Sequence, residues 1–238
     1  RFGNLIDGTQ AEYVLVPDAA GNLAPVPDGL TDEQVLMCPD IMSTGFVGAE
    51  NANIRIGDTV VVIAQGPIGL CATAGAKLRG ATTIIAVDGN DERLAVAKKL
   101  GADVTLNFRN VDVVDEVLKI TGGKGADSAI EALGLQSTFE QAMRCIKPGG
   151  TLSSLGVYSS DLKIPLGPFG AGLGDHKINT ALCPGGKERL RRLMNVIESG
   201  RVDLKPLVTH ERKLDDIVEA YDLFANQRDG VLKIAIKP

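Results

Sequence analysis

Residues 59–80, TVVVIAQGPIGLCATAGAKLRG, decide the fold. Residues 59–64 are a continuous, mostly β-branched apolar run, the segment QGPIG follows, and LCATAGAKLRG then shows helical spacing of its apolar residues. The stretch therefore predicts a buried strand, a tight turn and a helix. Because a strand that is apolar throughout is buried on both faces, it also predicts a parallel sheet covered by helices.

The same order of elements repeats along the chain. ATTIIAVDGN (81–90) predicts a second strand, DERLAVAKKLGA (91–102) a helix closed by Gly101, and DVTLNF (103–108) a third strand. The later segments predict helices at 111–123, 137–150 and 186–200, and strands at 126–134, 151–156 and 176–183. The predicted fold class is α/β, a doubly wound parallel six-stranded sheet of the Rossmann type.

The two flanks differ from this central region. Residues 1–40 are rich in Pro, Gly and Asp, with one alternating stretch, AEYVLVP (11–17), and residues 205–238 contain one helical segment (214–227) and a closing strand (231–238). Neither flank has enough apolar periodicity for its own core. We therefore predict a sheet domain at 44–195 and a second domain that contains residues 1–43 and 196–238.

Composition excludes several classes of protein. The chain has 238 residues, 44% of them hydrophobic, and a formal net charge of -5, which disfavours a nucleic-acid partner. Its four cysteines are widely spaced and form no Cys-x-x-Cys pair, so we expect a reducing compartment. The first residues lack the features of a signal peptide, and no apolar stretch is long enough for a membrane span, so we predict a soluble, cytoplasmic protein.

The turn after the first strand has the features of a phosphate-binding loop. Gly66 would let the backbone approach a pyrophosphate, Gly69 would let the helix pack closely on the strand, and the helix N-terminus offers N–H groups and a positive dipole end. The fingerprint is incomplete, because Ala64 occupies its first glycine position. A glycine turn with a purely structural role is the alternative.

Asp88 makes a dinucleotide site the favoured interpretation. It ends the second predicted strand, nineteen residues after Gly69, where a carboxylate can bind the adenosine ribose and repel a 2′-phosphate, so we predict NAD rather than NADP. Asp88 could instead cap the helix that opens at Asn90. The two features also fit an S-adenosylmethionine-binding methyltransferase, whereas a short-chain dehydrogenase is disfavoured because neither Tyr158 nor Tyr221 has a Lys four residues later.

The whole chain resembles the zinc-containing medium-chain alcohol dehydrogenases, and most of all their tetrameric microbial secondary-alcohol branch. The resemblance rests on ordered segments that include DGTQAEYVLVPD (7–18), VLMCPDIMSTGFVGAE (35–50), QGPIGL (65–70), KLRGATTIIAVD (77–88) and HKINTALCPGGKERLRRLM (176–194). It implies that the flanks belong to a mostly β, GroES-like catalytic domain. It also makes the methyltransferase alternative less favoured.

The resemblance implies a set of site residues. Asp40 matches the third ligand of the catalytic zinc, and Thr44 matches the residue that touches the nicotinamide. The other implied contacts to the cofactor are Gln65, Gly66, Pro67, Ile68 and Gly69 at the pyrophosphate and nicotinamide, Asp88, Gly89 and Asn90 at the ribose, Phe108 at the adenine, Leu155, Gly156 and Val157 at the carboxamide, and Lys233 at the pyrophosphate. Without the resemblance, Asp40 would be read as a turn residue and Cys38 as a small buried hydrophobic residue.

The resemblance also implies an activity. Zinc would polarise a small, secondary alcohol, and hydride would pass between its carbon and NAD. In the secondary-alcohol branch the segment HKINTALCPGG (176–186) pairs across subunits, which implies a homodimer or homotetramer.

The expected zinc site is incomplete in this sequence. A catalytic zinc needs three protein ligands, and the Cys and the His of a Gly-His-Glu segment that supply two of them in the family have no counterpart here. His176 and His210 are interpreted as structural. We expect roughly one hundred residues of family sequence to precede Arg1. The alternative function is an NAD-binding fragment or interaction module without catalysis.

Overall fold

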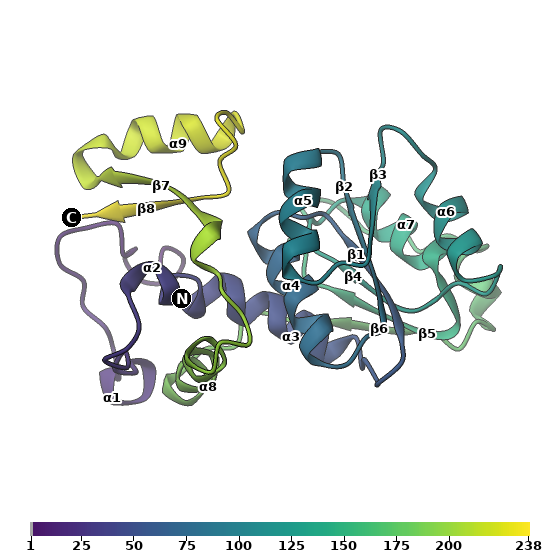
Figure 1. Cartoon of the computed structure of the whole chain (residues 1–238), viewed down its shortest axis with the longest axis horizontal. Helices are drawn as coiled ribbons and strands as arrows, with labels where there is room; N and C mark the ends of the chain where they lie inside the picture. The colour runs from purple at the N-terminus through teal and green to yellow at the C-terminus, as the bar shows by residue number, and fades with distance from the viewer. Residues whose placement is uncertain (1) are drawn as a thin grey trace. The chain divides into compact units, whose positions relative to one another are not determined.

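Six strands form one parallel sheet in the computed structural model, which describes residues 2–238. Their spatial order is β3-β2-β1-β4-β5-β6, and every neighbouring pair is parallel. The strands are β1 (Thr59–Ile63), β2 (Thr83–Asp88), β3 (Val104–Asn107), β4 (Ala126–Glu131), β5 (Ile146–Ser154) and β6 (Lys177–Thr180). The predicted doubly wound sheet is confirmed (Figure 1).

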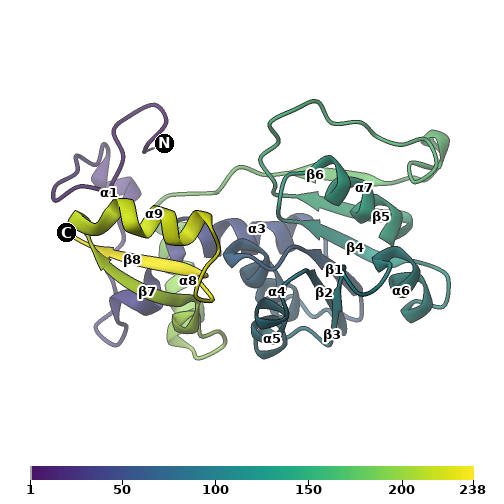
Figure 2. The same ribbon diagram turned by 90° about the horizontal axis from the view of Figure 1, so that it is seen from above.

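Helices cover both faces of this sheet. The helices α3, α4 and α5 contact one another in series on one face, and α6 contacts α7 on the other (Figures 1 and 2). Their bounds are α3 (Ser43–Asn51), α4 (Pro67–Leu78), α5 (Asp91–Leu100), α6 (Val113–Ile120) and α7 (Gln136–Cys145). Under α6 and α7, Phe139 and Met143 pack with Val61 and Ile85 in a fully buried core. Burial of the strands on both faces is what their continuous apolar runs require.

The chain divides into two compact units. Asp40–Pro184 form the first, which we call the sheet unit, and Arg1–Pro39 with Gly185–Pro238 form the second, the flank unit. These boundaries differ from the predicted domain limits, because α8 (Lys187–Glu198) contacts α1 and α2 of the flank unit. Arg1, before which we expected further family sequence, lies outside the described residues.

The flank unit contains a small sheet of its own. Strands β7 (Val208–Lys213) and β8 (Lys233–Lys237) pair in parallel, with α9 (Ile217–Ala225) between them in the chain. The other elements of this unit are α1 (Ala19–Asn22), α2 (Asp32–Val35), η1 (Cys38–Met42, which runs into the sheet unit), η3 (Lys205–Leu207) and η4 (Leu214–Asp216). The alternating stretch at 11–17 forms no strand, and Tyr13 and Leu15 are 90% and 86% exposed.

One further difference from the sequence prediction concerns residues 146–150. IKPGG was expected to end a helix, but α7 stops at Cys145 and these residues begin β5. Ile146 is extended and pairs with Ala126 of β4. The physical reason is Pro148, which cannot continue a helix and forces the residue before it into extended backbone. In the described part of the chain, no helix combines the length and apolar character needed to cross a bilayer.

Candidate functional site

The sheet has one topological switch point, which lies between β1 and β4. The chain leaves β1 toward β2 and β3 on one side, then returns to β4 and β5 on the other. In doubly wound sheets, ligands bind outside the carboxyl ends of the strands at such a point. The loop at residues 64–69 follows β1, Asp88 ends β2, and Leu155 follows β5. Parallel strand ends therefore bring these three predicted regions to one edge of the sheet.

The turn from β1 into α4 is shaped by two glycines. A Cβ added to Gly69 would lie 1.8 Å from the carbonyl oxygen of Ala64, so the helix can pack here only without a side chain. Around Gly66 there is no heavy atom within 4 Å of such a Cβ, so its backbone is open to a ligand. Pro67 and Ile68 open α4, whose first N–H groups have no partner within the helix. The turn thus presents an N-terminal helix end to the switch point.

The side chain of Gln65, one of the predicted cofactor contacts, is bonded within the protein. The side chain is fully buried, its Nε2 donates to the Val62 carbonyl at 3.0 Å, and its Oε1 accepts from the Thr73 hydroxyl at 3.0 Å. These bonds join β1 to α4 and leave no side-chain atom of Gln65 exposed to a ligand. Its backbone N–H is also occupied, because it donates to Oδ2 of Asp88 at 2.7 Å.

Asp88, the residue predicted to bind a ribose, accepts one backbone N–H on each carboxylate oxygen. Its Oδ2 accepts from the Gln65 N–H at 2.7 Å and its Oδ1 from the Asn90 N–H at 2.9 Å. An ionised carboxylate has about four lone-pair sites, so about two remain for ribose hydroxyls. The alternative that Asp88 caps the next helix is wrong, because Asn90 caps α5 by accepting from the Glu92 and Arg93 N–H groups. The side-chain oxygen of Asn90 is therefore occupied.

The segment after β3 lies against the turn after β2. A Cβ added to Gly89 would lie 2.5 Å from the ring of Phe108 and 3.1 Å from Nε of Arg109. The ring of Phe108 is half exposed, so an adenine could pack on it. Sequence reasoning missed Arg109. The available signal was its position, as a cation directly after Phe108 at the end of a strand.

The predicted carboxamide contacts follow β5. Leu155 is buried and its N–H donates to the Glu131 carbonyl at 2.8 Å, whereas the side chain of Val157 is 89% exposed. Gly156 lies between them, against Gly134 of the loop after β4. Sequence reasoning also missed Glu131, whose carboxylate is fully buried at the end of β4.

Asp40 and Thr44 lie one helical turn apart and contact each other. The Thr44 hydroxyl donates to Oδ1 of Asp40 at 3.2 Å. Thr44 is buried, whereas Asp40 is exposed. Burial raises the pKa of the Cys38 thiol to about 11, so this thiol is protonated at neutral pH and is not a prepared metal ligand. Asp40 is the exposed carboxylate of this short segment.

The described residues do not assemble a complete metal centre. Between residues 2 and 238, no group of three or more His, Cys, Asp and Glu side chains lies close enough together to hold a metal ion. His210 contacts Thr209 and Asp229 in the flank unit, and both ring nitrogens of His176 are buried without a hydrogen-bond partner. The described residues therefore do not fit a catalytic zinc.

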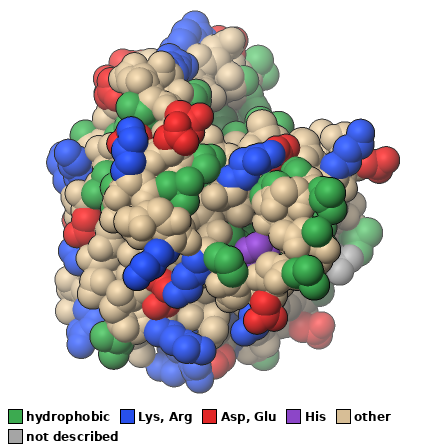
Figure 3. Space-filling view, turned by 90° about the vertical axis from the view of Figure 1, so that its right-hand side faces the viewer, with side chains coloured by type: hydrophobic (Ala, Val, Ile, Leu, Met, Phe, Trp, Pro, Cys, Tyr) green, Lys and Arg blue, Asp and Glu red, His purple; other side chains and the backbone are tan. Residues whose placement is uncertain are grey.

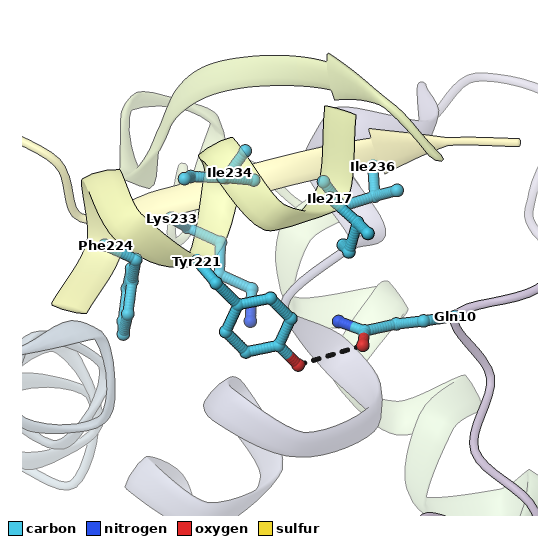
Figure 4. Close-up of a pocket in the computed structure, with 8 residues that line it drawn as sticks. Gln10, Ile217, Tyr221, Phe224, Lys233, Ile234 and Ile236 are labelled. Carbon is cyan, nitrogen blue, oxygen red and sulfur yellow. Dashed lines mark hydrogen bonds between the residues drawn. The ribbon is translucent and has the colours of Figure 1, made fainter. Parts of the chain in front are cut away.

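Lys233 belongs to the flank unit. It lies on β8 and lines a pocket in which the Tyr221 hydroxyl donates to Oε1 of Gln10 at 2.9 Å (Figure 4). The pocket is otherwise lined by α9 and β8, through Ile217, Ala220, Phe224, Ile234 and Ile236. A pyrophosphate contact by Lys233 stays a prediction.

The molecular surface carries mixed charge. On the face drawn in Figure 3, Lys and Arg side chains are interspersed with Asp and Glu. The formal net charge of the whole chain is -5.

Comparison with known proteins finds a dehydrogenase family and two alcohol dehydrogenase relatives. Residues 67–199 match the family described as zinc-binding dehydrogenase. An alcohol dehydrogenase of Cupriavidus necator is 82% identical over all 238 residues, which cover 65% of that relative, so the chain spans less than two thirds of its length. An NADP-dependent isopropanol dehydrogenase of Clostridium beijerinckii is 41% identical, over 99% of this chain and 68% of that relative.

Solved structures show the same similarity. A zinc-dependent alcohol dehydrogenase from Streptococcus pneumonia has a TM-score of 0.89 and 31% identity, over 97% of this chain and 66% of that one. An alcohol dehydrogenase from Thermus sp. ATN1 has a TM-score of 0.87 and 31% identity, over 96% and 65%.

Proposed function

Because the chain belongs to the zinc-binding dehydrogenase family, we propose that it forms the cofactor-binding part of an alcohol dehydrogenase that transfers hydride between NAD(H) and a small secondary alcohol or its ketone. The family membership implies zinc and a nucleotide cofactor and makes the methyltransferase alternative untenable. One observation carries the proposal: the open glycine turn into α4 lies next to Asp88 at the switch point of the sheet.

The pyrophosphate would bind at the start of α4. The Gly66 backbone is unobstructed, and the first turn of the helix supplies N–H groups and a positive dipole end. Pro67 removes one donor but fixes the first helical residue. These features let the backbone, rather than side chains, hold the phosphates.

The adenosine would bind between Asp88 and Phe108. Two lone-pair sites of Asp88 remain for the ribose hydroxyls, and the charge of this nearly buried carboxylate would repel a 2′-phosphate. Arg109 would favour NADP instead, since its guanidinium lies against Gly89 and could attract the 2′-phosphate. We propose NAD because a carboxylate would lie at the ribose in this arrangement, although relatives of this chain are named as NADP-dependent.

The nicotinamide would lie toward Thr44 and the Leu155–Val157 backbone. The bound nicotinamide supplies the hydride acceptor, and the protein supplies its orientation. The Thr44 hydroxyl proton is held by Asp40, which fixes the direction of that hydroxyl. Leu155 is anchored to β4 through its N–H, so the following backbone is held in place for hydrogen bonds to a carboxamide.

A test of this function measures binding and turnover separately. Purified chain is titrated with NADH and NADPH by fluorescence, its zinc content is measured, and oxidation of 2-propanol is assayed. We expect NADH to bind at least tenfold more tightly than NADPH. Tighter binding of NADPH would remove the NAD assignment, and absence of binding by either would remove the cofactor function.

A second candidate function is cofactor binding without catalysis. It is favoured by the lack of a group of three metal-binding side chains among residues 2–238. In that case the purified 25.0 kDa chain binds NADH, contains no zinc and gives no turnover. Turnover with stoichiometric zinc would exclude this candidate.

We also propose that two copies associate through β6. This strand is an edge of the sheet, so one side of its backbone has no neighbouring strand within the described residues. Such edges pair readily with another chain, and the proposed product is a homodimer or homotetramer. Light scattering after size-exclusion chromatography tests this, and a Lys177→Pro or Ile178→Pro change should shift the mass to that of a monomer, whereas an unchanged mass would place the interface elsewhere.

A further inference from the structure

Glu131 is a fully buried carboxylate at the switch point, and the proposed cofactor contacts do not use it. It is the last residue of β4, next to Ile63 of β1 and Ser154 of β5 in the sheet register. A buried carboxylate is costly unless hydrogen bonds satisfy it. The partners of Glu131 therefore indicate what the residue does.

The first oxygen of this carboxylate holds the loop after β4. Oε1 accepts from the N–H groups of Leu133 and Gly134, at 2.9 and 2.8 Å, and from the Thr138 hydroxyl at 2.8 Å. Thr138 lies in the first turn of α7. One oxygen therefore ties the strand end to both the loop and the helix that follow it.

The second oxygen holds the segment after β5. Oε2 accepts from the Tyr158 hydroxyl at 2.9 Å and from the Ser154 hydroxyl at 3.4 Å, and the two hydroxyls lie 2.8 Å apart. The backbone of Glu131 adds to this connection, because its carbonyl accepts from the Leu155 N–H. The residues Leu155–Val157 thus lie between two points that are bonded to Glu131.

A close backbone contact completes the arrangement. A Cβ added to Gly156 would lie 2.2 Å from the Gly134 nitrogen and 2.5 Å from Oε2 of Glu131. A Cβ on Gly134 would lie 2.5 Å from the Val157 carbonyl oxygen. The loops after β4 and β5 therefore touch through their backbones directly above the carboxylate, and a displacement of one moves the other.

Tyr158, one of the donors to Glu131, keeps its proton at neutral pH. Burial raises the pKa of Tyr158 well above its ordinary value, and the charge of Glu131 acts in the same direction. The Tyr158 ring also packs edge-on against Phe139, with centroids 6.3 Å apart at 83°. The phenol therefore stays a hydrogen-bond donor at neutral pH and holds a fixed position.

We propose that Glu131 is a positioning residue, which fixes the Leu155–Val157 backbone for contact with the nicotinamide end of the cofactor. This inference rests on the proposed function. A carboxylate is an unfavourable choice for a purely structural position, because burying a charge costs more than packing an apolar side chain of similar volume. Two acceptor oxygens suit this position, because N–H and O–H groups from the loop after β4, from α7, from the end of β5 and from the segment after β5 converge on it.

The test compares two ligands on one variant. Glu131→Gln keeps the shape but replaces one acceptor oxygen with a donor NH₂, which opposes the donors already present. Affinities for NADH and for ADP-ribose, which lacks the nicotinamide, are measured by calorimetry on the full chain. We expect NADH to bind roughly tenfold more weakly than to the wild-type chain, and ADP-ribose to bind within about twofold of wild type.

The matched control is Glu140→Gln. Glu140 lies on the exposed surface of α7, where it pairs with Arg144, and its substitution also removes one negative charge. We expect it to leave both affinities unchanged. Equal loss of both ligands in Glu131→Gln, or no loss of either, overturns the positioning role.

The proposed cofactor function and the positioning role of Glu131 can be contradicted separately. If the wild-type chain binds neither ligand, the proposed cofactor function fails. If wild type binds both and Glu131→Gln does not discriminate between them, only the positioning role fails. Should circular dichroism show that Glu131→Gln is unfolded, Tyr158→Phe decides instead: it removes one donor to Oε2 and should weaken NADH about fivefold while sparing ADP-ribose.

Discussion

The sheet unit and the flank unit bury their apolar residues to very different extents. In β1, Val60, Val61 and Val62 are completely buried, between neighbouring strands and under helices on both faces. In the flank unit, a two-stranded parallel sheet carries one helix, and Val218 on that helix is 78% exposed. The flank unit does bury some apolar residues, among them Met37, Leu204 and Leu207. Six strands with helices on both faces thus enclose whole strands, whereas the two-stranded sheet leaves part of α9 in solvent.

The largest expected effect comes from the core of the sheet unit. Phe139→Ala removes a fully buried ring by which α7 packs on the sheet, and we expect a loss of about 3–5 kcal/mol in the free energy of unfolding. Phe224→Ala is the matched change in the flank unit, where the ring is about half exposed, and should cost less than about 1.5 kcal/mol. Urea unfolding measures both. Equal losses would show that the two units are equally well packed.

The next effect tests the turn that joins β1 to α4. Gly69→Ala places a Cβ against the Ala64 carbonyl oxygen, so the helix must shift, and we expect a loss of about 1–3 kcal/mol in stability. Gly66→Ala is the matched control, because its Cβ would meet no atom within 4 Å and its φ of -69° suits any residue. Thermal unfolding followed by circular dichroism compares them. Similar melting temperatures for the two variants would mean that this turn is not closely packed.

Cofactor binding separates the contributions of the two units. Asp88→Ala in the sheet unit should weaken NADH binding about tenfold, because it removes the acceptor proposed for the ribose hydroxyls. It should also reduce the factor by which NADH binds more tightly than NADPH. Lys233→Ala in the flank unit tests the predicted pyrophosphate contact and should weaken NADH binding about threefold, since a charge contact that solvent reaches is worth less. Fluorescence titration measures both affinities. A larger loss from Lys233→Ala would place the main cofactor contacts in the flank unit.

The smallest expected effect is the pH dependence of the stability that Asp127 contributes. Partial burial acts to raise the pKa of Asp127, but hydrogen bonds from Lys147 and the Thr59 N–H outweigh it and hold the pKa below its ordinary value of 3.8. Because the folded-state pKa is lowered, Asp127 stabilises the sheet unit above the unfolded value, and this stability is lost as pH falls through the folded pKa. Asp127→Asn should therefore lower the urea midpoint at pH 7, and the difference from wild type should shrink at about pH 3.

Glu188→Gln in the flank unit is the control for this pH dependence. Hydrogen bonds from Arg191 and Arg192 lower the pKa of Glu188 to about 2, yet all three side chains are exposed. Solvent screens such pairs, so we expect little change in the midpoint at pH 7. A larger change in the urea midpoint for Glu188→Gln than for Asp127→Asn would contradict the expectation that the ion pair in the sheet unit contributes more to stability.

The adenosine end of the site could be predicted from local sequence. A β-branched run, a glycine turn and a carboxylate at the end of the next strand lie in one stretch of the chain, and each signal is set by its neighbours in sequence. Asn90, which caps α5, shows the limit of such signals, because the sequence alone left open that Asp88 was the cap of this helix.

The nicotinamide end could not be predicted in the same way. Glu131 and Tyr158 are separated by 27 residues and meet only because β4 and β5 are neighbours in the sheet. Gln65 gave a similar difficulty, since a polar residue in a binding loop favours a ligand contact, but its side chain turns inward to Val62 and Thr73.

The parallel sheet, its covering helices and the glycine turn could be predicted from the amino-acid sequence, because apolar periodicity and turn chemistry act over a few residues. Which strand ends adjoin, which carboxylate is buried and which side chains are already occupied became known only from the folded chain. The physical reason is that a hydrogen bond between distant residues depends on strand order and register, and neither is written in the spacing of any single segment.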